Sequence, residues 1–133
     1  MPDEMRVPIL TEYDIVTARQ RVKELSTALN FSSAEQTLVA TCVSELARNI
    51  VEYAGTGEMT IGLTNNKEAK GIIIIAEDKG PGIPDIELAM KDGYSTSKGL
   101  GIGLPGSRRI MDEFEIVSKP GEGTTITVKK WKR

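Results

Sequence analysis

Hydrophobic positions repeat every three to four residues through the first part of the chain, which predicts two helices. Thr11–Asp14 has the pattern of a capping box that opens the first helix, and residues 30–31 end it. Ser33 with Gln36 supplies a second capping signal, for a helix that continues to about Tyr53 and stops at the glycines that follow. The apolar face of the first predicted helix consists of Ile15, Ala18, Val22, Leu25 and Leu29.

The pattern changes in the middle of the chain, where alternating and continuous apolar runs predict strands. Met59, Ile61 and Leu63 alternate with smaller or polar residues, as in a half-buried strand. The continuous apolar run 72–76 is typical of a strand that is buried on both faces. Residues 65–67 carry a turn signal between the two strands, so the pair is predicted to form a hairpin.

A second hairpin is predicted near the end of the chain, with strands at about 114–117 and 125–131 and a turn at 120–123. A glycine-bounded insert and a helix separate the two hairpins and form a helical lid region. Because no linker or repeat interrupts the chain, we expect a single domain over residues 1–133. The order of elements predicts an α+β two-layer sandwich, in which helices cover one face of a largely antiparallel, mixed sheet.

Composition and charge narrow the class of protein. The formal net charge is -2, with acids and bases interspersed, so the chain lacks the basic footprint of a nucleic-acid binder. Histidine is absent, which excludes Ser-His nucleophile pairs and histidine metal ligands. A single cysteine, Cys42, and the lack of a signal peptide or long apolar span predict a soluble protein of the cytoplasm that does not enter a membrane. We expect Cys42 to pack in the core.

One basic run lies at the end of the last predicted strand. It consists of Lys129, Lys130, Lys132 and Arg133, with Trp131 among them. We interpret this run as the solvated end of a strand, although it could contact acidic lipid or RNA.

Two glycine clusters flank a polar insert within residues 77–104 and indicate an ATP site. Asp78 follows the buried strand, and Gly80 and Gly82 let the backbone approach a flat ligand. A carboxylate at the end of a buried strand is an acceptor for an adenine amino group, although Asp-x-Gly alone also fits an exposed turn. The second cluster opens a helical pattern, so its amides and the helix N-terminus would bind phosphate. It consists of Gly99, Gly101 and Gly103.

Two polar residues of the second predicted helix face the same way as its apolar residues. Glu45 and Asn49 lie one turn apart within the apolar arc. Arg48 and Glu52 point away from that arc. A structural network with Arg48 or Thr41 would satisfy the two inward side chains, which need partners when buried. Alternatively the pair lines a cleft, in which Asn49 would bind Mg²⁺ and Glu45 would accept a proton from an attacking hydroxyl. The arc itself consists of Leu38, Cys42, Leu46, Ile50 and Tyr53.

A polar segment just before the second glycine cluster could close over a γ-phosphate. It consists of Ser95, Thr96, Ser97 and Lys98. For Lys98, a phosphate contact and a solvated position both remain open. The cluster itself lacks the Gly-Lys-Ser/Thr of a P-loop, and no apolar strand immediately precedes it, as a dinucleotide-binding fold would require.

Taken together, these motifs resemble the GHKL superfamily of ATPases and kinases, which is built on the Bergerat fold. The resemblance extends from Thr11 to Trp131, and within the superfamily the chain looks most like the small serine kinases of the anti-sigma-factor type that act on stressosomes. The motifs, in order, are Glu45-x-x-x-Asn49, Asp78-x-Gly80-x-Gly82, Gly99-x-Gly101-x-Gly103 and Gly123-Thr124.

The resemblance implies a role for each motif. Adenine would be bound by Asp78 beside the first glycine cluster, with Thr124 near the base. Mg²⁺ would be held through Asn49, and Glu45 would be the catalytic base. The residues that it places around the nucleotide and its phosphates are Gly80, Gly82, Ser95, Thr96, Lys98, Gly99, Gly101, Gly103 and Leu104.

The resemblance also implies an activity. Sensor histidine kinases of the superfamily carry a dimerising helical domain with an acceptor histidine, and this chain has neither, so a protein serine/threonine kinase is expected. Its substrates would be STAS-domain proteins of a bacterial partner-switching stress response, and its second partner a PP2C-type phosphatase that it activates by binding. The alternative is a nucleotide-gated regulatory protein that sequesters or activates a partner and phosphorylates only secondarily, such as an anti-sigma factor that binds a sigma factor.

Overall fold

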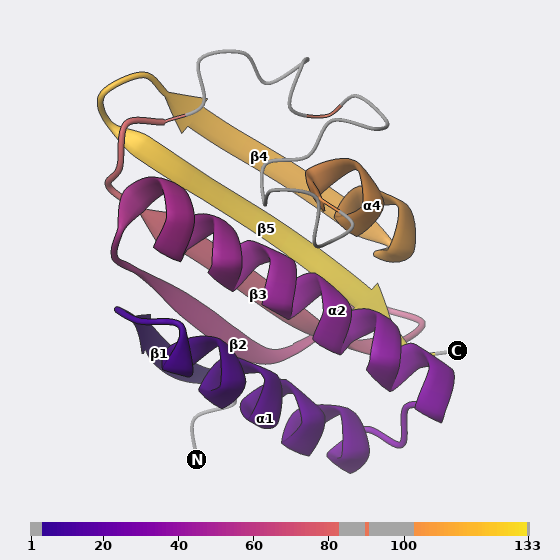
Figure 1. The fold of residues 1–133 in the computed structure, drawn as a ribbon. Coiled ribbons are helices and arrows are strands. Elements are labelled where there is room, and N and C mark those ends of the chain that lie inside the picture. The colour runs from indigo at the N-terminus through magenta and orange to yellow at the C-terminus, as the bar shows by residue number, and fades with distance from the viewer. Residues whose placement is uncertain (1–3, 83–89, 91–102, 133) are drawn as a thin grey trace.

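In the computed structural model, which describes residues 4–82, 90 and 103–132, five strands form one sheet in the order β1-β2-β3-β5-β4. The strands are β1 (Glu4–Ile9), β2 (Gly57–Asn65), β3 (Lys70–Asp78), β4 (Glu113–Lys119) and β5 (Gly123–Trp131). The helices pack on one face of this sheet (Figure 1). They are α1 (Tyr13–Ala28), α2 (Ser33–Asn49), the π-helical turn η1 (Ile50–Ala54) and α4 (Gly103–Ile110).

The fold class predicted from the sequence is confirmed, as are both hairpins. Strands β2 and β3 form the first hairpin, and β4 and β5 form the second. All strand pairs within the described residues are antiparallel. The described part of the sheet therefore lacks the parallel pair that a mixed sheet would contain. Strand β1, which the sequence did not predict, pairs with β2 at one edge of the sheet.

Strand β3 departs from the expectation that both of its faces would be buried. Ile72, Ile74 and Ala76 are buried on the face beneath the helices. Ile73 and Ile75 are only half-buried, because they lie on the opposite face, which no described helix covers. The continuous apolar run therefore belongs to a central strand with one covered face.

Local side-chain bonds set the helix boundaries. The capping box of α2 is formed by Ser32 and Glu35, one residue earlier than we expected: Ser32 Oγ accepts from Glu35 N at 3.1 Å, and Glu35 Oε1 accepts from Ser32 N at 3.0 Å. At the start of α1, Asp14 Oδ2 accepts from Thr11 N at 3.0 Å, which is one half of the predicted box. Asn30, at a φ of 60°, ends the segment after α1.

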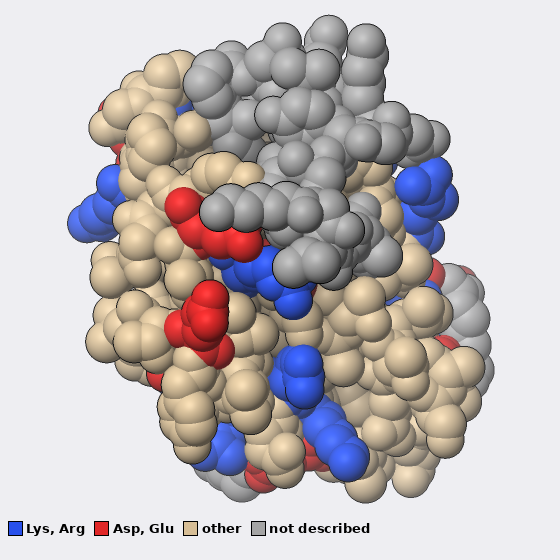
Figure 2. All heavy atoms as spheres, in the orientation of Figure 1, with Lys and Arg blue, Asp and Glu red and all other residues tan. Residues whose placement is uncertain are grey.

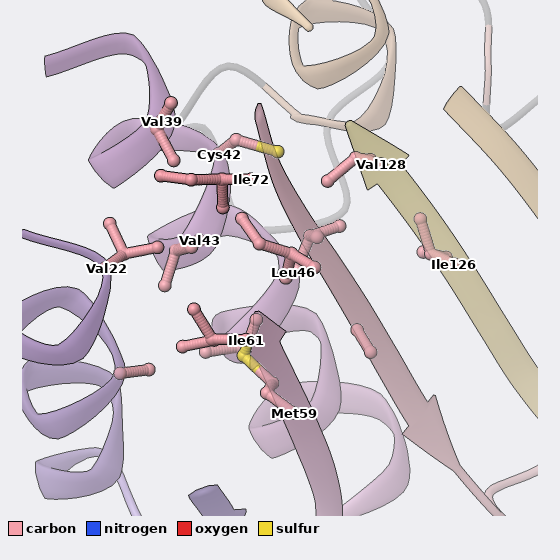
Figure 3. Close-up of a cluster of buried hydrophobic side chains, with 14 of the residues drawn as sticks. Val22, Val39, Cys42, Val43, Leu46, Met59, Ile61, Ile72, Ile126 and Val128 are labelled. Carbon is pink, nitrogen blue, oxygen red and sulfur yellow. The ribbon is translucent and has the colours of Figure 1, made fainter. Parts of the chain in front are cut away.

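The core lies between the helices and the sheet. Figure 3 shows side chains of α2, including Cys42 and Leu46, pointing toward strand residues such as Ile126. Cys42 is fully buried, as predicted. Tyr53 does not belong to this core, contrary to our expectation, because it lies in the π-helical turn at the end of α2 and 51% of the residue is exposed.

The basic run at the end of β5 is not a solvated strand end throughout. Lys130 is only 8% exposed, because it lies on the helix-covered face of the sheet. Elsewhere on the helical side, acidic and basic side chains are interspersed (Figure 2), in agreement with the small net charge. Within the described ranges, no helix is both long and apolar enough to cross a membrane.

Candidate nucleotide-binding site

Glu45 lies near the end of α2 and is almost completely buried, with 2% of the residue exposed. A buried carboxylate needs a partner, and Arg48 provides one: its Nη1 donates to Glu45 Oε1 at 2.9 Å. The prediction that Glu45 faces inward is confirmed. The prediction that Arg48 points away is wrong, because the side chain turns back by one helical turn to reach the carboxylate. The i, i+3 spacing is the signal that could have revealed this pair.

Asn49 is the last residue of α2, and its side chain is half-buried. The π-helical turn η1 follows it directly and closes with a bond from Gly55 N to Ile50 O at 2.8 Å. Turns of this type are rare and frequently occur at functional sites. Asn49 and Glu45 therefore lie one turn apart at the end of α2, next to an irregular turn.

Asp78 ends β3, as predicted, and its orientation is fixed by its own turn. Gly80 N donates to Asp78 Oδ1 at 2.9 Å, a side-chain turn typical of aspartate before glycine. A Cβ at Gly80 would lie 2.6 Å from the Ala54 Cβ, so only glycine permits the turn to approach η1 this closely. The end of β3 is thereby held against the turn that follows Asn49.

The β4–β5 turn packs against the other side of this loop. Gly121 N donates to Pro81 O at 2.7 Å, and Gly82 adopts a φ of 79°. Thr124 pairs with Asp78 across the β3–β5 ladder. The Thr124 hydroxyl lies 2.8 Å from Ser118 Oγ. The structure thus brings Thr124 beside the end of β3, and its place near the base stays a prediction.

The glycine cluster that precedes α4 is described only at its last member. Gly103 begins α4 with a φ of 66°, and its carbonyl accepts from the Ser107 hydroxyl at 3.0 Å. Leu104 is 1% exposed and belongs to the core, so its side chain supports the helix from within. The other predicted phosphate and lid residues lie outside the described residues: Ser95, Thr96, Ser97, Lys98, Gly99 and Gly101.

Helix α4 packs against α2 close to Glu45. Burial raises the pKa of the Cys42 thiol to about 12, a hydrogen bond with Ser107 partly offsets this effect, and the nearby Glu45 carboxylate raises it further. Ser107, which the sequence did not single out, is thus a contact between the two helices. This contact joins the second half of α2, which contains Glu45, to the middle of α4.

The residues present fit a magnesium nucleotide. Within the described residues there is no cluster of three or more acidic, cysteine or histidine side chains that could form a metal site from protein ligands alone. Mg²⁺ usually keeps several waters and is held by one or two protein ligands together with phosphate oxygens. A single amide oxygen from Asn49 is consistent with that mode of binding.

Comparison with known proteins identifies the family. Residues 34–133 match the family described as histidine kinase-, DNA gyrase B- and HSP90-like ATPase. The chain belongs to this family. The sequence resemblance to GHKL ATPases is therefore confirmed, and the site lies in an ATP-binding domain.

Relatives refine this assignment, and two solved structures share the fold. The chain is 52% identical over 133 residues, all of both chains, to the serine/threonine-protein kinase RsbT of Bacillus subtilis (strain 168). It is 30% identical over 118 residues, 85% of this chain and 81% of the other, to the anti-sigma F factor of Bacillus licheniformis. Among solved structures, it is similar to the RsbU and RsbW domains of a Mycobacterium tuberculosis protein, with a TM-score of 0.68 and 16% identity, over 98% of this chain and 33% of that one. The mycobacterial sensor histidine kinase MprB gives a TM-score of 0.56 at 14% identity, over 100% of this chain and 99% of that one.

Proposed function

We propose that this protein is an ATP-dependent serine/threonine kinase that phosphorylates STAS-domain proteins in a bacterial partner-switching stress response. The observation that carries the proposal is the 52% identity, over the full length of both chains, to the serine/threonine-protein kinase RsbT of Bacillus subtilis. The enzyme class predicted from the sequence is confirmed by that relative. Because the reaction consumes ATP, we place it in the cytoplasm.

The nucleotide would be held by residues from several elements. Asp78 Oδ1 is occupied by the Gly80 amide, so Oδ2 would accept the adenine amino group, with Thr124 beside the base. The phosphates would extend toward Gly103 and the glycines before it, where backbone amides at a helix N-terminus favour anions. Asn49 would hold Mg²⁺, which neutralises phosphate charge when bound.

Glu45 would act as the catalytic base. The substrate hydroxyl oxygen attacks the γ-phosphorus, the bond from phosphorus to the β–γ bridging oxygen breaks, and ADP leaves. The hydroxyl proton passes to the Glu45 carboxylate. Burial beside Arg48 supports this role, because the hydrogen bond keeps the carboxylate in one orientation.

A second function is favoured by a different observation. Several relatives that are 30–32% identical over 85–86% of this chain are anti-sigma F factors. We therefore propose as the alternative a nucleotide-gated protein that binds a sigma factor. In the kinase reading, the binding partners would be STAS-domain substrates and a PP2C-type phosphatase that is activated by binding.

The test is to incubate the purified chain with labelled ATP, Mg²⁺ and purified STAS-domain proteins, and then to locate the phosphorylated residue. The kinase reading expects label on a serine or threonine of the STAS protein. ATP-dependent capture of a sigma factor without transfer of label would favour the alternative instead. If the chain bound neither ATP nor any of these proteins, both proposed functions would be excluded.

A further inference from the structure

Lys130 occupies a position that lysine rarely takes. It pairs with Ile72 in the β3–β5 ladder and therefore lies on the helix-covered face of the sheet, where the residue is only 8% exposed. A buried ammonium destabilises a protein unless it is paired. The kinase mechanism described above does not use this residue, so its burial needs another explanation.

The Lys130 ammonium binds the C-terminal end of α4. Its Nζ donates to the carbonyl oxygen of Ile110, the last residue of the helix, at 2.8 Å, and lies 3.8 Å from Asp112 Oδ1. The last carbonyls of a helix lack partners within the helix and carry partial negative charge. Lys130 therefore satisfies one of these carbonyls and stabilises this end of α4 electrostatically.

Further bonds from the same end of β5 hold the residues that follow α4. Asp112 Oδ2 accepts from the backbone N–H of Trp131 at 2.7 Å, and the backbone N–H of Asp112 donates to Lys129 O at 3.0 Å. The Trp131 indole N–H donates to Glu113 Oε2 at 2.8 Å. The C-terminal end of α4 is thus anchored to the end of β5.

The opposite end of α4 lies at the proposed nucleotide site. Gly103 begins the helix, and the residues from Gly103 to Ser107 are all buried. The helix has only 8 residues, among them two glycines and a proline, so it has little intrinsic stability. Its position must therefore be set by tertiary contacts, which include the packing of Leu104 in the core and the bond from Lys130 at the C-terminal end.

We propose that Lys130 is a positioning residue for the kinase reaction: by anchoring the C-terminal end of α4, it fixes where Gly103 lies relative to Glu45. The inference rests on the proposed function, because the position of Gly103 matters only to a bound nucleotide. Among the described residues, the Lys130 ammonium contacts Ile110 and Asp112 and not Glu45 or Asp78, so Lys130 acts through α4.

The experiment compares ATP binding and amide exchange in wild type and Lys130→Met, a change that keeps an unbranched apolar side chain and removes the ammonium. Titration calorimetry with Mg-ATP should show about tenfold weaker binding, equivalent to roughly 1.4 kcal/mol. The α4 amides should exchange with solvent faster by a larger factor than the β3 amides. Lys130→Arg should restore both properties, and the control Lys132→Met, at an exposed position, should change neither.

A double variant separates positioning from general stability. Lys130→Met removes an ammonium that lies 3.8 Å from Asp112 Oδ1, whereas adding Asp112→Asn removes the carboxylate charge as well and keeps an oxygen for the Trp131 amide. Thermal stability should then recover, while ATP binding stays weak because the Ile110 carbonyl still lacks the Lys130 donor. If ATP affinity recovers together with stability, the role of Lys130 is structural only and the proposal is overturned.

The failure of this inference can be distinguished from the failure of the proposed function. Wild-type protein that binds no ATP overturns the kinase function, and with it the reaction to which Lys130 is assigned. Wild-type protein that binds ATP no more tightly than Lys130→Met overturns the positioning role alone. The positioning role is also overturned if amide exchange in Lys130→Met is accelerated equally in all elements, because α4 would then not be the element that Lys130 anchors.

Discussion

Two carboxylates at the candidate site are held in different ways, which suits different tasks. Asp78 is half-buried at a strand end and is oriented by the amide of Gly80. Glu45 is buried within a helix and is oriented by the guanidinium of Arg48. A carboxylate held by its own backbone turn is suited to ligand recognition, whereas one held by a cation can receive a proton without changing position. Separate substitutions should therefore affect binding and catalysis separately.

Asp78→Asn should weaken ATP binding. Asparagine keeps an oxygen for the Gly80 amide but removes the charged acceptor for the adenine amino group. Because a hydrogen bond to a charged group contributes about 1.5–3 kcal/mol, the dissociation constant should rise by about tenfold to a hundredfold. Calorimetry measures this change, with Glu77→Gln at the exposed neighbouring position as the control. Unchanged affinity in Asp78→Asn would remove Asp78 from the site.

Glu45→Gln should leave ATP binding normal but should strongly reduce phosphate transfer. Glutamine still accepts a hydrogen bond from Arg48 but cannot take the proton of the substrate hydroxyl. Loss of a general base lowers the rate by about 10²–10⁴-fold, which labelled-ATP transfer to a STAS-domain protein would measure. The exposed Glu52→Gln, two turns further along the chain, is the matched control. Transfer at the wild-type rate would mean that Glu45 is not the base.

At the scale of elements, α2 begins with a regular capping box and ends in an irregular π-helical turn. The capping box of Ser32 and Glu35 satisfies backbone N–H groups at the first end. At the other end, the turn η1 brings Ala54 under Gly80 and so joins the helix to the end of β3. The side-chain cap therefore lies at the end of α2 opposite to the residues that would bind nucleotide.

The capping box should make stability depend on pH. The hydrogen bond from Ser32 N lowers the pKa of Glu35 in the folded state. A lowered pKa stabilises the folded state above the unfolded value, about 4.3, and this contribution is lost as the pH falls through the folded pKa. Urea unfolding should therefore show Glu35→Gln less stable than wild type at pH 7, with the difference shrinking near pH 3. A difference that is the same at both pH values would contradict this, and Glu68→Gln, in an exposed turn, controls for the loss of one surface charge.

The order of elements could be predicted because each pattern is local. Apolar spacing identified both long helices, and turn residues identified both hairpins, including the strand end at Asp78. Strand β1 was missed because it is an edge strand of 6 residues in which only Val7 and Ile9 are buried, and it contains Pro8. So short a pattern cannot be distinguished from a loop without its partner β2.

Contacts between distant residues could not be predicted in this way. A run of basic residues at the end of β5 resembles a solvated strand end, and only the position of α4 shows that Lys130 has a carbonyl to bind. The same holds for the pair formed by Ser107 and Cys42, which depends on how α4 packs on α2. Glu45 was an exception, since its place in an apolar helical arc already indicated burial.

At the scale of the whole molecule, the buried face of the sheet and the helices above it form one core with a single cysteine inside. Cys42 lies in α2 and is completely buried among residues from the helices and the sheet (Figure 3). Because burial raises its pKa to about 12, the thiol remains protonated in the folded protein at any ordinary pH. Its reaction with an alkylating reagent requires the thiolate, and therefore requires the core to open.

Alkylation of Cys42 should consequently report global unfolding and nucleotide binding together. At pH 8 without urea, labelling measured by mass spectrometry should be far slower than for a small thiol, and urea should accelerate it in step with the unfolding transition. ATP at about a hundredfold excess over its dissociation constant stabilises the folded state by roughly 2.7 kcal/mol, so labelling should slow by about a hundredfold. Fast labelling without urea would instead show that α2 and α4 separate locally. If ATP left a slow rate unchanged, then the folded chain would have no nucleotide site at all.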